Sequence, residues 1–192
     1  MRVALGGGGI TKKNEVLLGF IRNLSATGEA SAKNYYGIGE GWSQAHNTDI
    51  WAMTCPVGLG EGDPNWANWP FGGAWLATHI WEHWLFTRDM EALKRNYPAL
   101  KGAAEFCMAY LIEKDGELIS SPSTSPENIY ITPDGYYGRT AYGTTSDHAI
   151  IRECLSNAVS AASLLGDSSF AEKAEDVLSR LGGYKVGANG AL

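Results

Sequence analysis

Apolar residues recur every three or four positions along most of this chain, which is the spacing of an amphipathic helix. The first such stretch begins at Asn14 and ends near Gly37, and its apolar positions are Val16, Leu17, Phe20, Ile21 and Leu24. Residues 1–13, which contain a run of glycines, lack this pattern. We therefore predict an irregular leader over 1–13, followed by a long helix.

Later stretches repeat the helical spacing and come in pairs joined by short turns. Further helices are expected over Gly72–Thr87, Asp89–Asn96, Pro98–Glu113, from about Thr145 to Leu165, and from Asp167 or Ser168 onward. Few stretches alternate between apolar and polar residues as strands do. Helix pairs of this kind indicate stacked αα-hairpins. The predicted fold class is all-α, with residues 14–192 forming about half of an (α/α)6 barrel or toroid at roughly 40–60 residues per hairpin.

All 7 tryptophans lie between Trp42 and Trp84, among Gly, Asn, His and acidic residues. So many indole rings suit a cleft that binds a flat, weakly polar ligand such as a sugar ring. The net charge is −6 and no basic run is longer than Lys12-Lys13, so nucleic acid is not an expected partner. No stretch is long and apolar enough for a transmembrane helix, so no membrane contact is expected either. The 3 cysteines are too widely spaced for a metal-binding motif and are predicted to be buried.

Residues 46–51, with the sequence HNTDIW, place an imidazole, an amide and a carboxylate beside an indole. One interpretation is an Asx-type turn that caps a short helix. The other is recognition of sugar hydroxyls, because each hydroxyl can be held by one donor and one acceptor. The pattern favours recognition and makes His46, Asn47 and Asp49 candidate binding residues.

Glu127 ends a proline-punctuated loop with the sequence SSPSTSPEN. It could mark a helix start, with Ser125 as the cap and Pro126 in the first turn. At the same time, the two prolines and a tyrosine-rich flank (Tyr130, Tyr136 and Tyr137) could hold a carboxyl in place, bury it in part and keep it protonated. A glycosidase acid has these properties.

Two further motifs have an ordinary structural interpretation that we prefer. His79 and His83 belong to a match with HxxEH, the zinc motif of inverted metalloproteases, but no comparable signal marks a third ligand. Core histidines are therefore expected, with no metal and no cofactor. Asp147 belongs to Thr145-Ser146-Asp147, which is expected to cap the helix that follows, although a place on the rim of a pocket is the alternative.

Several blocks of the chain, in order, resemble the catalytic domain of glycoside hydrolase family 95. They are GWSQAHNTDIW, WPFGGAWLATHIWEHWLFTRD, YPALKGAAEF, SPSTSPEN and TSDHAIIRE, within about residues 14–192. This family comprises mainly α-L-fucosidases that act especially on α-1,2 linkages, with some α-L-galactosidases, and its fold is an (α/α)6 barrel. The resemblance implies an inverting mechanism with Glu127 as the general acid. It also implies that the pocket is lined or supported by His46, Asn47, Asp49, Trp75 and His83.

The resemblance also implies a base side, which this sequence lacks. In the family, asparagines of an NINTQMNYW-like block and a carboxylate of a DGNFG-like block work together as the base, and neither block occurs here. The chain is thus expected to be a middle fragment that is inactive alone. Its expected partners are a fucosylated glycan and the remainder of the barrel. A zinc peptidase and a noncatalytic helical module that binds a glycan or a protein remain the alternatives.

Overall fold

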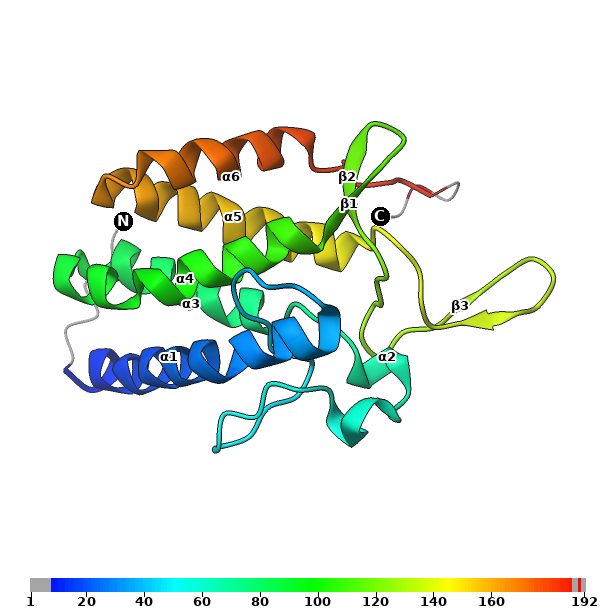
Figure 1. Cartoon of the computed structure of the whole chain (residues 1–192), viewed down its shortest axis with the longest axis horizontal. Helices are drawn as coiled ribbons and strands as arrows, with labels where there is room; N and C mark the ends of the chain where they lie inside the picture. Colours follow the sequence, from blue (N-terminus) through cyan, green and yellow to red (C-terminus); the bar gives the residue numbers. More distant parts are fainter. Residues whose placement is uncertain (1–7, 188–189, 191–192) are drawn as a thin grey trace.

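The computed structural model describes residues 8–187 and 190, and the described chain is mostly helical (Figure 1). Its long helices are α1 (Gly8–Tyr36), α3 (Gly72–Thr87), α4 (Met90–Tyr110), α5 (Thr145–Leu165) and α6 (Ser168–Arg180). Its short helices are the 3-10 helix η1 (Val57–Gly60) and α2 (Pro64–Ala67). Two small antiparallel hairpins pair β1 (Leu111–Lys114) with β2 (Glu117–Ser120), and β3 (Tyr130–Ile131) with β4 (Tyr137–Gly138). The all-α prediction is confirmed.

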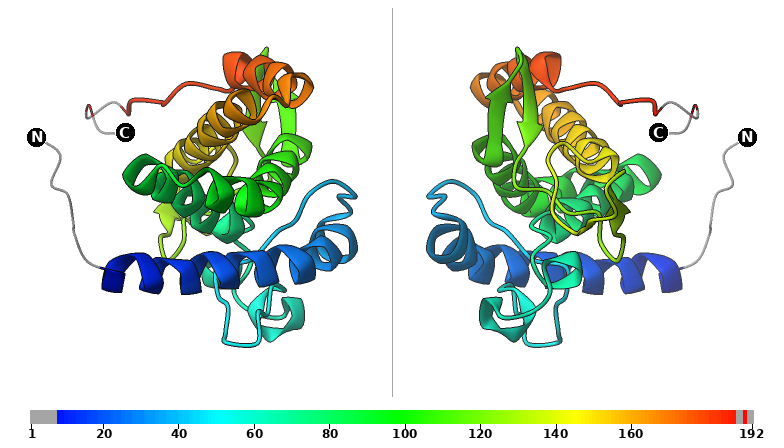
Figure 2. Two further views of the ribbon diagram at one scale, coloured as in Figure 1. Left: turned by 90° about the vertical axis from the view of Figure 1, so that its left-hand side faces the viewer. Right: turned by 90° about the vertical axis from the view of Figure 1, so that its right-hand side faces the viewer.

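The helices form two αα-hairpins, α3–α4 and α5–α6, and α1 lies across α3 and α4 (Figures 1 and 2). Each hairpin turns at a residue in the left-handed conformation, Arg88 with φ of 57° and Gly166 with φ of 80°. An N-cap aspartate follows each of them, Asp89 before α4 and Asp167 before α6. The predicted bounds of α3 and the predicted start of α6 are confirmed, as is the pairing into αα-hairpins.

A single helix, α4, replaces the two helices predicted on either side of Pro98. A proline inside a helix removes one backbone hydrogen bond and costs about 3 kcal/mol. Large apolar side chains before and after it, including Leu93, Leu100 and Phe106, are almost fully buried in the core. Each such side chain contributes about 1.5–3 kcal/mol on burial. Packing against α3 and α5 therefore outweighs the proline, and a break at this position was the wrong prediction.

The helix predicted to continue to Glu113 ends at Tyr110, and a hairpin takes over. The turn residues Asp115 and Gly116 both have positive φ, of 53° and 84°. Asp-Gly between two apolar runs is a strong signal for a two-residue β-hairpin, because both residues tolerate positive φ. The sequence carried this signal in LIEKDGELIS.

Helix α1 starts at Gly8, so residues 8–13 are helical and not the irregular leader that was predicted. Residues 1–7 of that prediction lie outside the described chain. Gly37, with φ of 71°, ends the helix as predicted, and its N–H donates to the carbonyl of Lys33. None of the helices in the described part is long and apolar enough to cross a membrane.

The indole of Trp42 fixes the place where α1, α3 and α4 meet. A Cβ added to Gly28, Gly73 or Gly102 would stand 2.9, 2.5 or 2.8 Å from this side chain, so each helix approaches it through a glycine. Trp42 Nε1 donates to the carbonyl of Ala99 at 2.7 Å. This anchor sets the start of the loop that carries residues 43–71.

Candidate functional site

Glu127 lies in a tight turn between β2 and β3, and no helix begins there. The N–H of Asn128 donates to the carbonyl of Ser125 at 3.0 Å, which closes the turn. Glu127 has φ of 61°, a left-handed conformation that costs an L-residue about 1–2 kcal/mol. Its N–H donates to the carbonyl of Asn65, in α2, at 2.8 Å. The helix start predicted here is wrong, and a strained, anchored turn of this kind is typical of functional sites.

The prediction that the tyrosines after Glu127 bury its carboxyl in part is wrong. Glu127 is exposed, and Tyr130, Tyr136 and Tyr137 are themselves 44%, 62% and 56% exposed. The ring of Tyr130 lies over Gly138, where an added Cβ would stand 2.0 Å from it. These residues form the β3–β4 hairpin, which extends away from the helices and pairs with itself (Figure 1).

Asp147 lies in the first turn of α5 and is completely buried. The cap of α5 is Thr144, whose Oγ1 accepts from the N–H of Asp147, so the prediction of Asp147 as the cap is wrong. The Asp147 carboxylate accepts hydrogen bonds from Trp69 Nε1, at 2.8 Å, and from Ser123 Oγ. Burial raises the pKa of Asp147 above its ordinary value, and these hydrogen bonds oppose the shift.

An aromatic cluster forms around Trp69, whose surface is only 3% exposed. The rings of His46 and Trp75 contact it edge to face, with centroids 6.3 and 6.2 Å away. Trp75 is 58% exposed, so the cluster presents an indole to its surroundings. The structure thus brings His46 and Trp75 together through Trp69, which the sequence analysis did not select. Its position directly before Pro70, between the long loop and α3, was the available signal.

The HNTDIW segment contains the predicted Asx turn. Asp49 Oδ1 accepts from the N–H groups of Trp51 and Met53, at 2.9 and 3.2 Å, and no helix follows. Asp49 therefore holds its own loop. Asn47 is exposed, and its Oδ1 lies 3.1 Å from His46 Nδ1. These two side chains lie beside the aromatic cluster.

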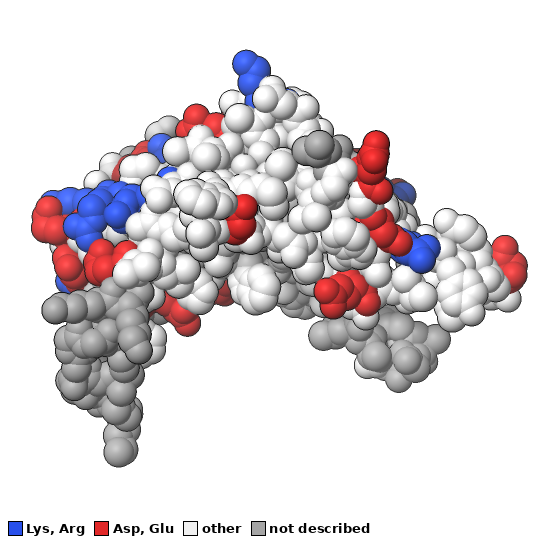
Figure 3. Space-filling view, turned by 90° about the horizontal axis from the view of Figure 1, so that it is seen from below, with Lys and Arg blue, Asp and Glu red and all other residues white. Residues whose placement is uncertain are grey.

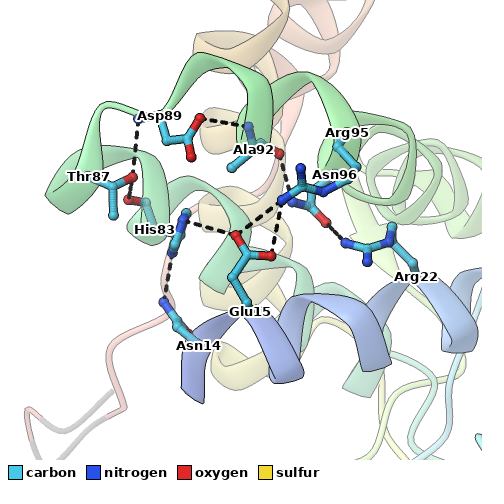
Figure 4. Close-up of polar contacts among 9 residues, drawn as sticks. All are labelled: Asn14, Glu15, Arg22, His83, Thr87, Asp89, Ala92, Arg95 and Asn96. Atoms are coloured by element: carbon cyan, nitrogen blue, oxygen red, sulfur yellow. Dashed lines mark hydrogen bonds and ion pairs between the residues drawn. The ribbon is translucent and has the colours of Figure 1, made fainter. Parts of the chain in front are cut away.

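His83 is buried in a polar network that joins α1 to α3 and α4 (Figure 4). Its Nδ1 lies 3.1 Å from Asn14 Nδ2, and its Nε2 lies 3.8 Å from a carboxylate oxygen of Glu15. Glu15 in turn pairs with Arg95 at 3.0 Å. His83 is eleven residues after Gly72, about 16 Å along α3 at 1.5 Å per residue. The structure therefore places it toward the opposite end of α3 from Trp69.

The two histidines of the HxxEH motif do not converge. His79 is partly exposed and lies 3.1 Å from the carboxylate of Glu82, one turn away on α3. His83 faces α1 instead. Within the described chain, no group of three or more His, Cys, Asp or Glu side chains could hold a metal ion.

A small cavity of about 120 Å³ lies beside the loop that leads to Glu127. Its lining residues include Asn68, Tyr110, Ser123, Thr124 and Thr140. The Oδ1 atoms of Asn65 and Asn68 are buried and have no hydrogen-bond partner among the described residues.

The face that carries α1 is mostly uncharged at its centre, with charged side chains toward its ends (Figure 3). The polar but uncharged groups that line the cavity suit a neutral, hydroxyl-rich ligand.

The stacked αα-hairpins define the chain as part of a helical-barrel protein, and an exposed indole beside polar side chains suits a sugar ligand. The family is shown by comparison: the model of the Glycosyl hydrolase family 95 catalytic domain covers residues 7–192, and the chain belongs to this family.

Two curated relatives are similar to the chain over part of their length. It is 42% identical over 164 residues to "Alpha-L-fucosidase 2" of Arabidopsis thaliana, which covers 84% of this chain and 19% of that protein. It is 31% identical over 120 residues to "Probable alpha-fucosidase A" of Aspergillus niger, covering 60% of this chain and 15% of that protein. The chain thus spans less than a fifth of the length of either relative.

Proposed function

We propose that this chain supplies the acid side of a glycoside hydrolase site that cleaves terminal α-L-fucosidic bonds. The observation that supports this most is the position of Glu127. Its turn is strained, its backbone is anchored to Asn65, and that anchor lies four residues before Trp69 in the aromatic cluster. A carboxyl on a fixed backbone can donate a proton to a glycosidic oxygen while the sugar packs against the aromatic cluster.

In the proposed inverting reaction, Glu127 donates its proton to the glycosidic oxygen as the bond to the anomeric carbon breaks. A water attacks the anomeric carbon from the opposite face, so its base stands about 6.5–9.5 Å from Glu127. We assign that base to residues beyond this chain. Since Glu127 is exposed among the described residues, we assign the cover that keeps it protonated to the same remainder of the domain.

For recognition, we assign direct sugar contacts to His46, Asn47 and Trp75. The Trp75 side chain is exposed and its ring contacts Trp69. His46 contacts the same Trp69 ring, and Asn47 lies beside His46. We assign supporting roles to Asp49, whose carboxylate holds its own loop, and to His83, which joins α3 to α1. An α-1,2-linked fucosyl group is the substrate we expect. An L-galactosyl group, which replaces the methyl of fucose by a hydroxymethyl, is the alternative.

The test uses a catalytic domain in which this segment is joined to the rest of the barrel. Glu127→Gln should abolish most cleavage of a natural disaccharide, since general acid catalysis contributes about 10²–10⁴-fold. The loss on a fucosyl fluoride should be much smaller, because fluoride leaves with little need for a proton. Glu61→Gln, at another exposed glutamate, is the matched control and should leave both rates unchanged. Equal losses on both substrates would show that Glu127 is not the proton donor.

Comparing fucosides with L-galactosides separates the two substrates. An apolar contact for the methyl group favours fucose by about 1–3 kcal/mol. A preference for the L-galactoside would overturn the fucosidase assignment while leaving the role of Glu127 intact.

A further inference from the structure

Asp147 is a buried carboxylate whose partners come from two different loops. Trp69 precedes α3, and Ser123 belongs to the loop that leads to Glu127. Ser123 is also tied to the α5 cap, since its Oγ lies 2.8 Å from Thr144 Oγ1. Among the described residues, no ion pair involves Asp147, so hydrogen bonds alone satisfy it.

Such a group is a poor choice for stability alone. A buried carboxylate loses its hydration, and well-packed apolar residues often replace buried charges without loss of stability. Its place in the first turn of α5 gives partial compensation from the helix dipole. What a carboxylate provides and an apolar side chain does not is two directed acceptors, here used by Trp69 and Ser123.

These contacts close a ring around the Glu127 turn. From Asp147, one path runs through Trp69 and back four residues to Asn65, whose carbonyl accepts from Glu127. The other path runs through Ser123 and forward four residues to Glu127. A backbone pairing of Ser123 with Ala141, at 2.9 and 2.8 Å, stiffens this second path.

We propose that Asp147 is a positioning residue that sets the distance between the aromatic cluster around Trp69 and the Glu127 carboxyl. This role rests on the proposed function. In it, the positions of the acid Glu127 and of the sugar-binding ring Trp75 both depend on the Asp147 side chain. Asp147 does not touch the substrate. It acts through Trp69 on one side and through Ser123 on the other.

The first experiment measures the hydrogen bond itself in this chain. The indole N–H resonance of Trp69, identified by its loss in Trp69→Phe, should lie at the low field expected for a bond to a carboxylate. Asp147→Asn should move that resonance, whereas Glu153→Gln, at an exposed carboxylate on the same helix, should not. An unchanged resonance in Asp147→Asn would overturn the proposal.

The second experiment measures positioning in the joined catalytic domain. Asp147→Asn should lower kcat on the natural disaccharide about 10- to 100-fold, the scale expected for a displacement near 1 Å. Its effect on the fucosyl fluoride should be less than about threefold, since that substrate depends little on the acid. Trp69→Phe combined with Asp147→Asn should lose less than the product of the single effects, because both act on one linkage.

The outcomes distinguish failure of the positioning role of Asp147 from failure of the proposed acid role of Glu127. If Glu127→Gln discriminates between the two substrates and Asp147→Asn does not, Asp147 is only structural and the positioning role is withdrawn. If Glu127→Gln fails to discriminate, the proposed acid is wrong. A changed melting temperature with equal losses on both substrates would also contradict a positioning role.

Discussion

The N–H of Glu127 donates to the carbonyl oxygen of Asn65 at 2.8 Å, from a backbone with φ of 61°. The contact joins the Glu127 turn to α2, two segments that are far apart in the sequence. It holds a glutamate in a conformation that glycine adopts freely and that other residues adopt at a cost.

Replacing Glu127 by glycine should therefore stabilise the fold relative to replacement by alanine. Both changes remove the carboxyl, but only glycine relieves the left-handed strain, by about 1–2 kcal/mol. Urea unfolding of Glu127→Gly and Glu127→Ala measures the difference in the free energy of unfolding. An alanine variant as stable as the glycine variant would mean that the turn relaxes easily and is not held by its anchor.

Alanine at the helix-contact glycines should be destabilising. In Gly73→Ala and Gly102→Ala the new Cβ would stand 2.5 and 2.8 Å from the Trp42 side chain, and such overpacking costs about 1–3 kcal/mol. Gly19→Ala is the matched control within α1, because its new Cβ would stand 3.6 Å from a guanidinium nitrogen of Arg22, an ordinary van der Waals contact. There the gain in helix propensity should stabilise the chain by up to about 1 kcal/mol. Thermal or urea unfolding gives all three values.

His148 should make the fold less stable as the pH falls below neutrality. Burial lowers the pKa of His148 below its ordinary value, and nearby Arg152 lowers it further, while Asp147 and Glu117 act in the opposite direction. The unfolded chain takes up this proton near pH 6.5, at which the folded chain still holds a neutral ring. The unfolded state thus binds more protons in this interval, so stability rises with pH and is lost as the pH drops through it.

The His148→Gln variant tests this pH dependence. The free energy of unfolding should fall less between pH 7 and pH 5 in the variant than in the unaltered chain. An identical pH dependence in both would mean that His148 is not the group responsible.

The chain by itself should self-associate. Large apolar side chains are exposed on its helices, among them Val16 on α1 at 74% and Phe86 on α3 at 77%. Contiguous apolar patches are uncommon on soluble monomers. Sedimentation should show oligomers whose fraction falls in the Val16→Lys/Phe86→Lys double variant. A monodisperse monomer at high concentration would contradict this expectation and the half-barrel interpretation behind it.

Much of the fold could be predicted because local patterns determine it. The bounds of α3, the N-cap Asp167 and the glycine that ends α1 follow from periodicity and capping alone. The uninterrupted α4 could not be predicted in the same way. Burial on both sides of Pro98 is a tertiary effect that outweighs a local rule.

The site was only partly predictable, for a related reason. Periodicity and composition select polar and aromatic blocks, and the structure does bring His46 and Trp75 together. Their mediator, Trp69, depends on a contact with Asp147 across the fold, which no local spacing reveals. His83 shows the reverse case, since a suggestive local motif is directed into a helix–helix contact.

The indole of Trp42 also has a consequence for the order of folding. The α3–α4 and α5–α6 hairpins join neighbours in sequence and close over short turns, whereas α1 reaches α3 and α4 only after the long loop of residues 37–71 is arranged. Closing a long loop is entropically slower than closing a short one. We therefore expect the two hairpins to form early and α1 to dock last, so that the rate at which Trp42 loses contact with water reports the final step of assembly.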